Sequence, residues 1–144
     1  MDRVQGGLMR TEITYKYTRN FSRKQLKDLF LSVEWSSGDY PDKLAIAMKN
    51  FDTVFSAWDG DELVGMICAM DDGIMNAYIH YLLVKPKYQF KGIGKKLVEM
   101  AKTHYKDYLR IVVITLNENV KFYEYCGFEK EEDKRALFIT ELEN

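Results

Sequence analysis

The stretch that most constrains this chain is the glycine turn Gln89-Phe90-Lys91-Gly92-Ile93-Gly94. A strand-like apolar run over residues 78–84 leads into the turn, and a helical pattern over residues 95–108 follows it. A strand that turns through glycines into a helix presents free backbone N–H groups at the positive end of the helix dipole, which is an anion-binding arrangement. The glycines let the main chain approach an anion closely because they carry no Cβ. We therefore expect the turn to hold a pyrophosphate group.

The local charge supports this interpretation. The chain of 144 residues has a net charge of −1, yet residues 85–96 contain no acidic side chain. They contain five lysines: Lys85, Lys87, Lys91, Lys95 and Lys96. We expect at most two of these lysines to contact phosphates, because lysines on a solvated loop would give the same pattern.

Two common nucleotide-binding loops do not fit this turn. A Walker loop requires the string G-x-x-x-x-G-K-[ST], which the chain lacks. A Rossmann fingerprint requires a third glycine, but Leu97 stands at that place. The next strand-like run, residues 111–116, is followed by Asn117 where a ribose-binding acid would be expected.

A third pattern, [Q/R]-x-x-G-x-[G/A] after a strand, matches the turn. In this respect it resembles the acyl-coenzyme-A loop of the GNAT superfamily of N-acetyltransferases, and the preceding Val84-Lys85-Pro86-Lys87-Tyr88-Gln89 is also typical of that family. A second segment downstream resembles the family's N-x-x-x-F-Y-x-x-x-G-F segment. It reads Asn119-Val120-Lys121-Phe122-Tyr123-Glu124-Tyr125-Cys126-Gly127-Phe128. The two motifs stand in the family's order and at its usual spacing.

The resemblance implies acetyl-CoA as the acetyl donor and no metal. It implies main-chain contacts to the coenzyme's arm from Leu82, Leu83 and Val84, and contacts to its diphosphate from the turn, that is Gln89, Phe90, Lys91, Gly92, Ile93, Gly94 and Lys95. It also implies that Asn119 helps to hold the cofactor. A role for Asn119 at the start of a helix explains that residue equally well.

Tyr123 is the predicted general acid, because the tyrosine of the second motif often has that role in the family. A thiol leaves with a pKa near 8.5 and tyrosine has a pKa near 10, so the proton transfer is uphill by only about 1.5 units. The alternative is an aromatic residue of an amphipathic helix whose hydroxyl bonds to the backbone. Cys126 has no histidine or acid at a recognisable spacing, so we expect it to be a buried packing residue.

His80 is the candidate base. Many members of the family carry a glutamate four residues before the valine that ends this strand, and here His80 occupies that position. Histidine can accept a proton near neutrality, so His80 is expected to take the amine proton directly or through water. Strand alternation places it on the same face as Leu82 and Val84. The alternative is a half-buried structural histidine.

The acceptor site of this family lies by the first two helices and their loop, where Trp35 and Tyr40 are the candidate contacts. Aromatic faces and nearby carboxylates suit a cationic amine, although Trp35 fits equally as a core anchor. The preferred function is an N-acetyltransferase acting on a primary amine of a small molecule. The alternatives are a protein or peptide N-acetyltransferase and a non-catalytic acyl-CoA-binding regulatory module.

Composition sets the broad class. Hydrophobic residues make up 47% and charged residues 30%, which is typical of a soluble globular chain, and one domain is expected over residues 1–144 with a loose tail at 1–10. No apolar run approaches the length of about 20 residues that a membrane helix needs, and no secretion signal is evident, so we expect a cytoplasmic protein with reduced cysteines. The near-neutral charge argues against a nucleic-acid partner, and a homodimer is compatible with the family.

The pattern of elements predicts a mixed α/β (α+β) fold. Helices are expected from Ser22 to about Val33, from Pro41 to Asn50, over 92–108 and over 119–125. Strands are expected at 12–18, 53–58, 62–70, 76–84 and 110–116, with a closing strand pair at 128–132 and 135–141. The GNAT resemblance implies a mostly antiparallel twisted sheet flanked by helices and splayed between its fourth and fifth strands.

Overall fold

The computed structural model describes residues 12–143, and the expected tail at 1–10 lies outside them. The centre is a five-stranded sheet with the order β2-β3-β4-β5-β6. Its strands are β2 (Ile13–Tyr17), β3 (Thr53–Asp59), β4 (Glu62–Asp71), β5 (Asn76–Val84) and β6 (Arg110–Val113). Neighbouring strands from β2 to β5 run antiparallel, and β6 runs parallel to β5. The predicted mixed, mostly antiparallel sheet is confirmed.

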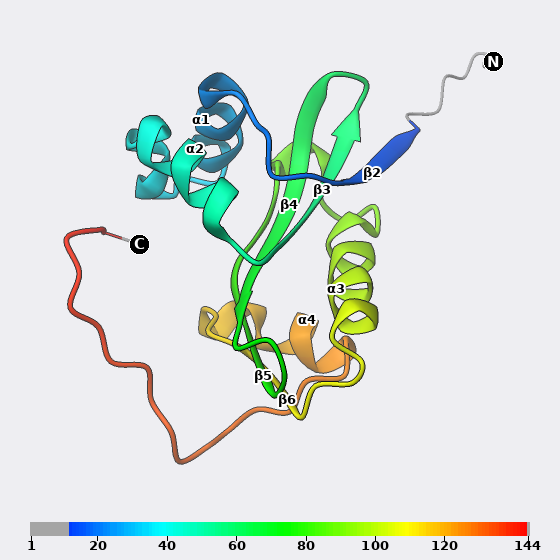
Figure 1. The fold of residues 1–144 in the computed structure, drawn as a ribbon, viewed down its shortest axis with the longest axis vertical. Coiled ribbons are helices and arrows are strands. Elements are labelled where there is room, and N and C mark those ends of the chain that lie inside the picture. Colours follow the sequence, from blue (N-terminus) through cyan, green and yellow to red (C-terminus); the bar gives the residue numbers. More distant parts are fainter. Residues whose placement is uncertain (1–11, 144) are drawn as a thin grey trace.

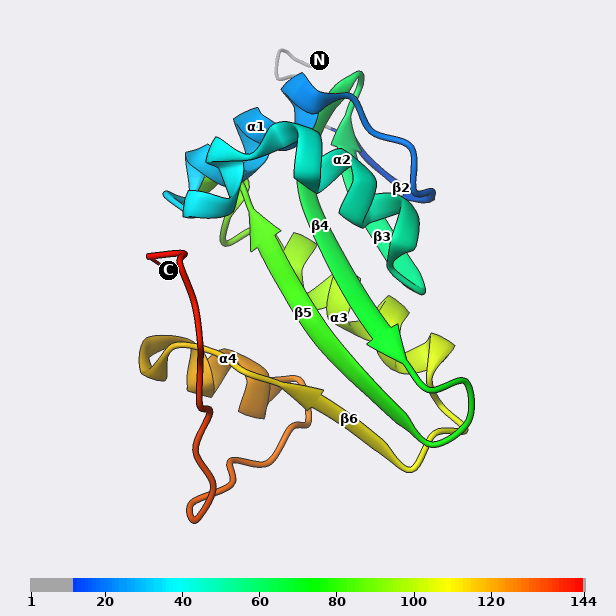
Figure 2. The same cartoon turned by 60° about the vertical axis from the view of Figure 1, so that its left-hand side comes forward.

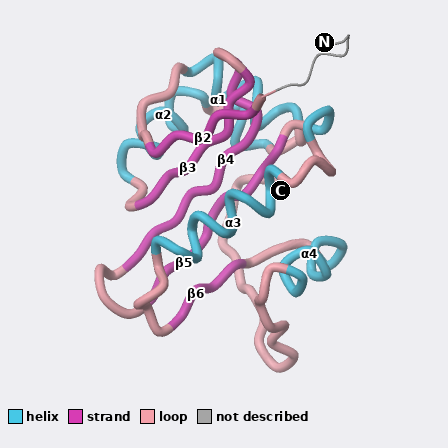
Figure 3. The backbone as a smooth tube through the Cα atoms, turned by 90° about the vertical axis from the view of Figure 1, so that its right-hand side faces the viewer, coloured by secondary structure: helices cyan, strands magenta, loops and turns pink. Residues whose placement is uncertain are grey.

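Helices cover both faces of this sheet. Helices α1 and α2 lie on one face, and α3 lies on the other (Figure 1). Figure 3 shows α3 lying across the strands. The helices are α1 (Arg23–Ser32), α2 (Pro41–Asn50), α3 (Ile93–His104) and α4 (Val120–Tyr125), with short 3-10 turns η1 (Ser36–Asp39), η2 (Pro86–Tyr88) and η3 (Asn117–Asn119). The two faces bury two separate hydrophobic clusters, so the central strands are apolar on both sides.

Strand β4 shows how the sequence builds two cores at once. Met66 and Cys68 belong to the cluster under α1 and α2, whereas Ile67 and Ala69 belong to the cluster under α3. Alternate residues of a strand point to opposite faces, so a continuous apolar run is what a doubly covered strand requires.

Helix α1 starts at a capping box formed by Ser22 and Gln25. The backbone N–H of Gln25 donates to the Ser22 hydroxyl at 3.0 Å, and the Ser22 N–H donates to the Gln25 side-chain oxygen at 2.9 Å. These two bonds satisfy backbone donors that the first helical turn leaves without partners. Pro41 begins α2 at the predicted residue, and the fixed φ of proline suits the first turn of a helix.

Strands β5 and β6 separate soon after they meet. Only Asn76–Ile79 pairs with Arg110–Val113, and beyond Ile79 the two strands diverge (Figure 2). The predicted splay between the fourth and fifth strands is therefore confirmed. The predicted strand at 110–116 ends at Val113 instead, because β5 no longer lies beside it from that point.

The predicted closing strand pair is wrong. Residues 129–143 form neither helix nor strand, and no backbone–backbone hydrogen bond joins them to another described residue. The chain turns at Gly127, which has a φ of +98°. All seven residues from 129 to 135 are charged, and their solvation carries the chain away from β6 (Figure 1).

Helix α3 also ends earlier than the predicted residue 108. The ring of Tyr105 is buried, and its hydroxyl donates to the Asp71 carboxylate at 2.8 Å and lies 2.7 Å from the Thr53 hydroxyl. These bonds tie the end of α3 to the sheet, and a turn closed by Tyr108 N–H on the Tyr105 carbonyl follows. Within residues 12–143, no helix has both the length and the apolar character needed to cross a bilayer.

We expect Ser22→Ala to lower the free energy of unfolding by about 1 kcal/mol, since the cap bond to the Gln25 N–H is lost. Urea denaturation followed by circular dichroism measures the change. Asn20→Ala, at an exposed position just before the cap, is the control and should leave the unfolding midpoint unchanged. Equal midpoints for all three proteins would show that the capping box does not stabilise the fold.

Candidate functional site

The glycine turn presents an open helix start. Phe90 and Gly92 both have left-handed backbone conformations, with φ values of +63° and +87°. Gly92 is the N-cap residue of α3, and no side chain caps the helix there. A Cβ placed on Gly92 would have no described atom within 4 Å, so the space above this turn is open. Left-handed residues next to an uncapped helix start direct backbone N–H groups into a concavity suited to an anion.

The turn and the second sequence motif lie against each other. A Cβ on Gly94 would lie 3.4 Å from the Phe122 ring and 3.9 Å from a methyl group of Val84. Gly94 therefore packs at the point where β5 ends and α4 approaches. This packing brings the start of α3 close to Tyr123, which follows Phe122 and contacts its ring edge-on.

The five lysines around the turn differ in the side chains that they contact. Lys85 and Lys87 pair with Glu62, at 3.0 and 4.0 Å. Lys95 lies over the Tyr125 ring and Lys96 over the Tyr15 ring. Lys91 has neither an ion pair nor a ring contact with a described residue, so it is the least engaged of the five. Lys91 and Lys95 are the two that best match the expectation of at most two phosphate contacts.

Gln89 has a local role in shaping the turn. Its side-chain amide donates to the Val84 carbonyl at 2.9 Å and so ties the turn to the end of β5. Tyr88 is buried, and its hydroxyl donates to the Asp59 and Glu62 carboxylates. The turn is thus anchored to the β3–β4 hairpin before it opens at Gly92.

Tyr123 is buried in the α3 face with 8% of its surface exposed. Its ring contacts Phe122 and Phe128. No hydrogen bond joins its hydroxyl to any residue in the described range, so the predicted alternative of a hydroxyl bonded to the backbone does not hold there. Burial raises the pKa of Tyr123 well above its usual value, and the group stays protonated at neutral pH.

Cys126 lies beside Tyr123 and is buried. Burial raises the pKa of its thiol, so it has little thiolate character. The structure therefore agrees with the prediction of a packing role. Asn119 is exposed at the start of α4, where its side chain makes no capping bond. Its role toward the cofactor stays a prediction.

His80 lies at an irregularity that the alternation of the sequence does not reveal. Strand β5 pairs Tyr81 with Cys68 and Ile79 with Ala69, so His80 between them is the extra residue of a β-bulge. The prediction that His80 shares a face with Leu82 and Val84 is wrong. Those two residues pack toward α3, whereas the bulge places His80 beside Tyr81 toward α1 and α2.

Aromatic rings lie on one side of the His80 imidazole, and the residue remains exposed to solvent on the other. The Tyr81 ring centre lies 4.4 Å away, the Tyr78 ring 5.4 Å and the Phe51 ring 6.0 Å. Its Nδ1 lies 3.2 Å from the Tyr78 hydroxyl. Burial of the imidazole among these rings lowers the pKa of His80 below 6.5, so it is neutral and able to accept a proton at pH 7.

The candidate acceptor contacts differ in exposure. Trp35 is half-buried and packs against Phe30 and Tyr81, with ring centres 6.1 and 5.8 Å away. Tyr40 is 44% exposed and is the N-cap residue of α2. Sequence reasoning missed Tyr78 and Tyr81, which connect His80 to this aromatic wall. The only signal for them was the density of tyrosines in the strand.

The splay separates two groups of predicted residues. Tyr123 and the glycine turn lie on the side of α3 and α4, and His80 with Trp35 lies on the side of α1 and α2. Beyond Ile79, one edge of β5 is not paired with β6, and Leu82, Leu83 and Val84 lie in this stretch. An extended group inserted along that edge would have proton donors and acceptors on both sides.

The sequence itself decides the family, because the profile of the Acetyltransferase (GNAT) family matches residues 17–128. The chain belongs to this family. It is 36% identical over 100 residues to the histone acetyltransferase TAP1 of Glycine max, which covers 60% of this chain and 43% of that protein. The chain spans less than half the length of the curated relatives it matches.

Solved GNAT structures share its fold. A GNAT family acetyltransferase of Streptococcus pneumoniae is 27% identical, covers 90% of this chain and 99% of its own, and superposes with a TM-score of 0.77. An aminoglycoside acetyltransferase from an uncultured soil sample, in complex with sisomicin, is 24% identical with a TM-score of 0.69 over 89% of this chain and 95% of its own. The family is one of acetyltransferases that generally use acetyl-CoA. No cluster of three metal-ligating side chains occurs within residues 12–143.

We expect the His80 imidazole to titrate with a midpoint below 6.5, because its partial burial disfavours the charged ring. Proton NMR of the histidine ring signals measures the midpoint, and His80→Gln identifies the signal. The unfolded chain binds a proton near pH 6.5 that folded His80 does not bind. This contribution to stability is therefore complete above pH 6.5 and declines as the pH falls through that value. A midpoint at or above 6.5 would contradict the description of the site.

Proposed function

We propose that this GNAT protein transfers an acetyl group from acetyl-CoA to a primary amine of a small molecule, with Tyr123 as general acid and His80 as base. The observation that carries the proposal is the buried Tyr123 hydroxyl, which has no described hydrogen-bond partner and lies on the α3 side of the splay. A buried hydroxyl without a partner is costly to the fold, so such a group indicates a functional role.

The residues of the donor side fit a coenzyme diphosphate. The uncapped start of α3, the left-handed Phe90 and Gly92, and the ammonium groups of Lys91 and Lys95 supply donors and positive charge to an anion. The unpaired edge of β5 at Leu82, Leu83 and Val84 offers main-chain groups to an extended amide-bearing arm. Acetyl-CoA, when bound, supplies the thioester carbonyl and the thiol leaving group.

Tyr123 then donates its proton to the leaving sulfur. Its raised pKa keeps the hydroxyl protonated, and the same burial raises the pKa of a thiol placed beside it, as Cys126 shows.

His80 accepts the proton that the attacking amine loses. Its lowered pKa leaves the imidazole neutral at pH 7, and the Tyr78 hydroxyl beside Nδ1 holds the ring in position. A free alkylamine is neutral only about once in 2,500 molecules at pH 7, so a base at this place gives a real gain in rate.

The aromatic wall supports a cationic acceptor. Trp35, Tyr81 and Phe51 lie around His80 on the α1 and α2 side, and ring faces attract ammonium groups. The aminoglycoside acetyltransferase of similar fold was solved with sisomicin, and this favours a small acceptor. The histone acetyltransferase name of a sequence relative favours a protein acceptor, so that function is the second candidate.

We expect Tyr123→Phe to lower kcat about 100-fold while coenzyme A affinity is retained, because only the proton donor is removed. Thiol release from acetyl-CoA measures turnover, and circular dichroism checks the fold. Tyr125→Phe is the matched control on the same helix, where the tyrosine is 73% exposed, and it should keep full activity. Turnover by Tyr123→Phe within twofold of the unmodified protein would remove the general-acid role.

An acceptor panel separates the candidate functions. Thiol release is measured with small primary amines, aminoglycosides, and peptides bearing a free N-terminus or lysine, while calorimetry measures coenzyme A binding. Release with the small amines alone is the expected result. Release with peptides alone would support the protein acetyltransferase, binding without release would support the regulatory module, and no binding at all would overturn the donor site.

A further inference from the structure

Phe90 is unusual for two separate reasons. Its side chain is fully exposed, and no other aromatic side chain within residues 12–143 is as exposed. Its backbone has a φ of +63°, and Glu34 is the only other non-glycine residue of that range with a positive φ. A large apolar ring in water is unfavourable, and a bulky residue in a left-handed conformation is rare. Packing within the described chain therefore does not account for this ring.

Phe90 takes no part in the contacts that hold the glycine turn. The two residues before it are tied inward, because the Tyr88 hydroxyl donates to Asp59 and the Gln89 side chain donates to the Val84 carbonyl at 2.9 Å. Two residues after it, a Cβ on Gly92 would meet no described atom within 4 Å. The phenyl ring thus borders the open space in front of the α3 start.

The proposed donor has three parts that meet the protein differently at this place. The start of α3 suits its diphosphate, and the unpaired edge of β5 suits its amide-bearing arm. Since the arm leaves the diphosphate toward β5, the adenosine at the other end leaves it in another direction, toward solvent. An exposed aromatic ring is a surface on which a planar base stacks.

We propose that the Phe90 ring stacks on the adenine base of the coenzyme and thereby selects donors whose thioester is carried on a nucleotide. The class that the ring disfavours is the pantetheine thioester without a nucleotide, whether free or attached to a carrier protein. The stacking requires the donor to lie on the glycine turn, so it rests on the proposed function. It adds a side-chain contact at a residue for which only a turn contact to the diphosphate was expected.

The conformation of Phe90 allows the roles of ring and backbone to be separated. Glycine adopts a positive φ without strain, so Phe90→Gly removes the ring and relieves the backbone together. A ring that served the fold would leave this variant less stable. A ring that serves the ligand should give a variant with an equal or higher urea midpoint of unfolding that nevertheless binds coenzyme A more weakly.

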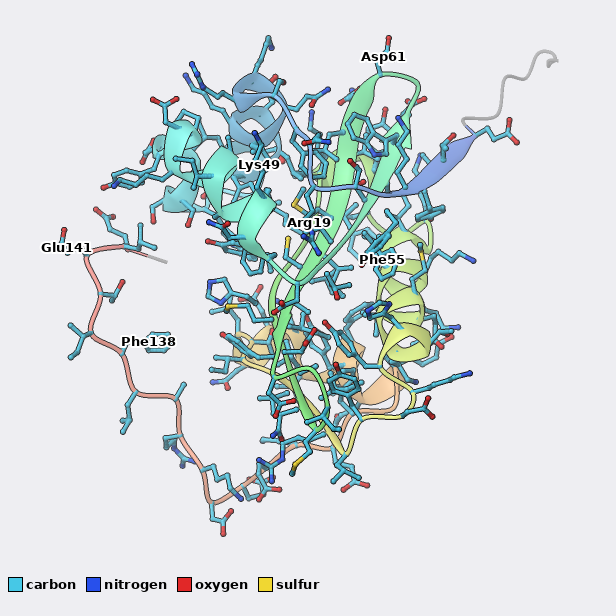
Figure 4. All side chains as sticks on the ribbon, viewed as in Figure 1. Arg19, Lys49, Phe55, Asp61, Phe138 and Glu141 are labelled. Carbon is cyan, nitrogen blue, oxygen red and sulfur yellow. The ribbon has the colours of Figure 1, made fainter. Side chains whose placement is uncertain are left out.

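Calorimetry of coenzyme A binding is the first test. The dissociation constant should be about tenfold higher in Phe90→Gly than in the unmodified chain, which is the effect of losing one stacked base. Phe90→Trp keeps an aromatic face and should recover most of the affinity. Phe138→Gly is the matched control, because it removes an exposed phenylalanine of the C-terminal segment, well away from α3 (Figure 4). This control should bind coenzyme A as the unmodified chain does.

Phosphopantetheine separates the nucleotide from the arm, because it has the same amide-bearing arm without the adenosine. Displacement calorimetry against coenzyme A measures its affinity for the unmodified chain and for Phe90→Gly. The two proteins should bind phosphopantetheine equally, so that the preference for coenzyme A over phosphopantetheine falls about tenfold when the ring is removed.

Three results would overturn the stacking. Equal affinity of Phe90→Gly and the unmodified chain for coenzyme A overturns it and leaves the proposed function in place. An equal loss of affinity for coenzyme A and phosphopantetheine does the same, since the substitution would then disturb the turn and not a contact with the base. An unmodified chain that binds no coenzyme A overturns the donor site itself and the stacking with it.

Discussion

The separation of β6 from β5 is the constraint on which the rest of this structure depends. The two strands pair over only four residues each, and a fully paired sheet would have no room for an extended ligand at this place. The separation leaves one edge of Leu82, Leu83 and Val84 without a β6 partner and sets the start of α3 beside α4. Gly94 packs at this junction, where a Cβ would be in van der Waals contact with the Phe122 ring at 3.4 Å. The proposed donor binding and proton transfer thus depend on a short parallel pairing.

The bulge at His80 is the second determinant. An extra residue in β5 turns two neighbouring side chains, His80 and Tyr81, to the same side of the sheet. The imidazole therefore joins the aromatic wall of α1 and α2 and leaves the α3 core to Ile79 and Leu82. The cost is one residue without a partner on β4, which is typical of bulges next to functional sites.

Much of the fold could be predicted from local signals. The Ser22–Gln25 capping box, Pro41 and the apolar run of β4 are encoded in neighbouring residues, and the structure has each of them. The glycine turn was also recognisable, because a left-handed backbone conformation such as that of Gly92 favours glycine, and glycines are visible in the sequence. Tyr123 could be selected only through its motif, since its burial and its unpartnered hydroxyl depend on tertiary packing.

What could not be predicted depends on contacts between distant segments. The bulge at His80 arises from the register between β4 and β5, and nothing in the sequence of β5 alone reveals it. The closing strand pair failed for a similar reason. Residues 135–141 have strand-forming side chains, but strand formation needs an adjacent partner, and the charged run at 129–135 carries them away from β6.

The placement of Tyr123 and His80 on opposite sides of the sheet has a kinetic meaning. An acetyl donor and an amine that approach from different directions can occupy the protein together, in either order. Both cysteines are buried, and no thiol is placed to carry the acetyl group between two separate half-reactions. The arrangement suits the proposed reaction, in which the amine attacks the thioester directly within a ternary complex.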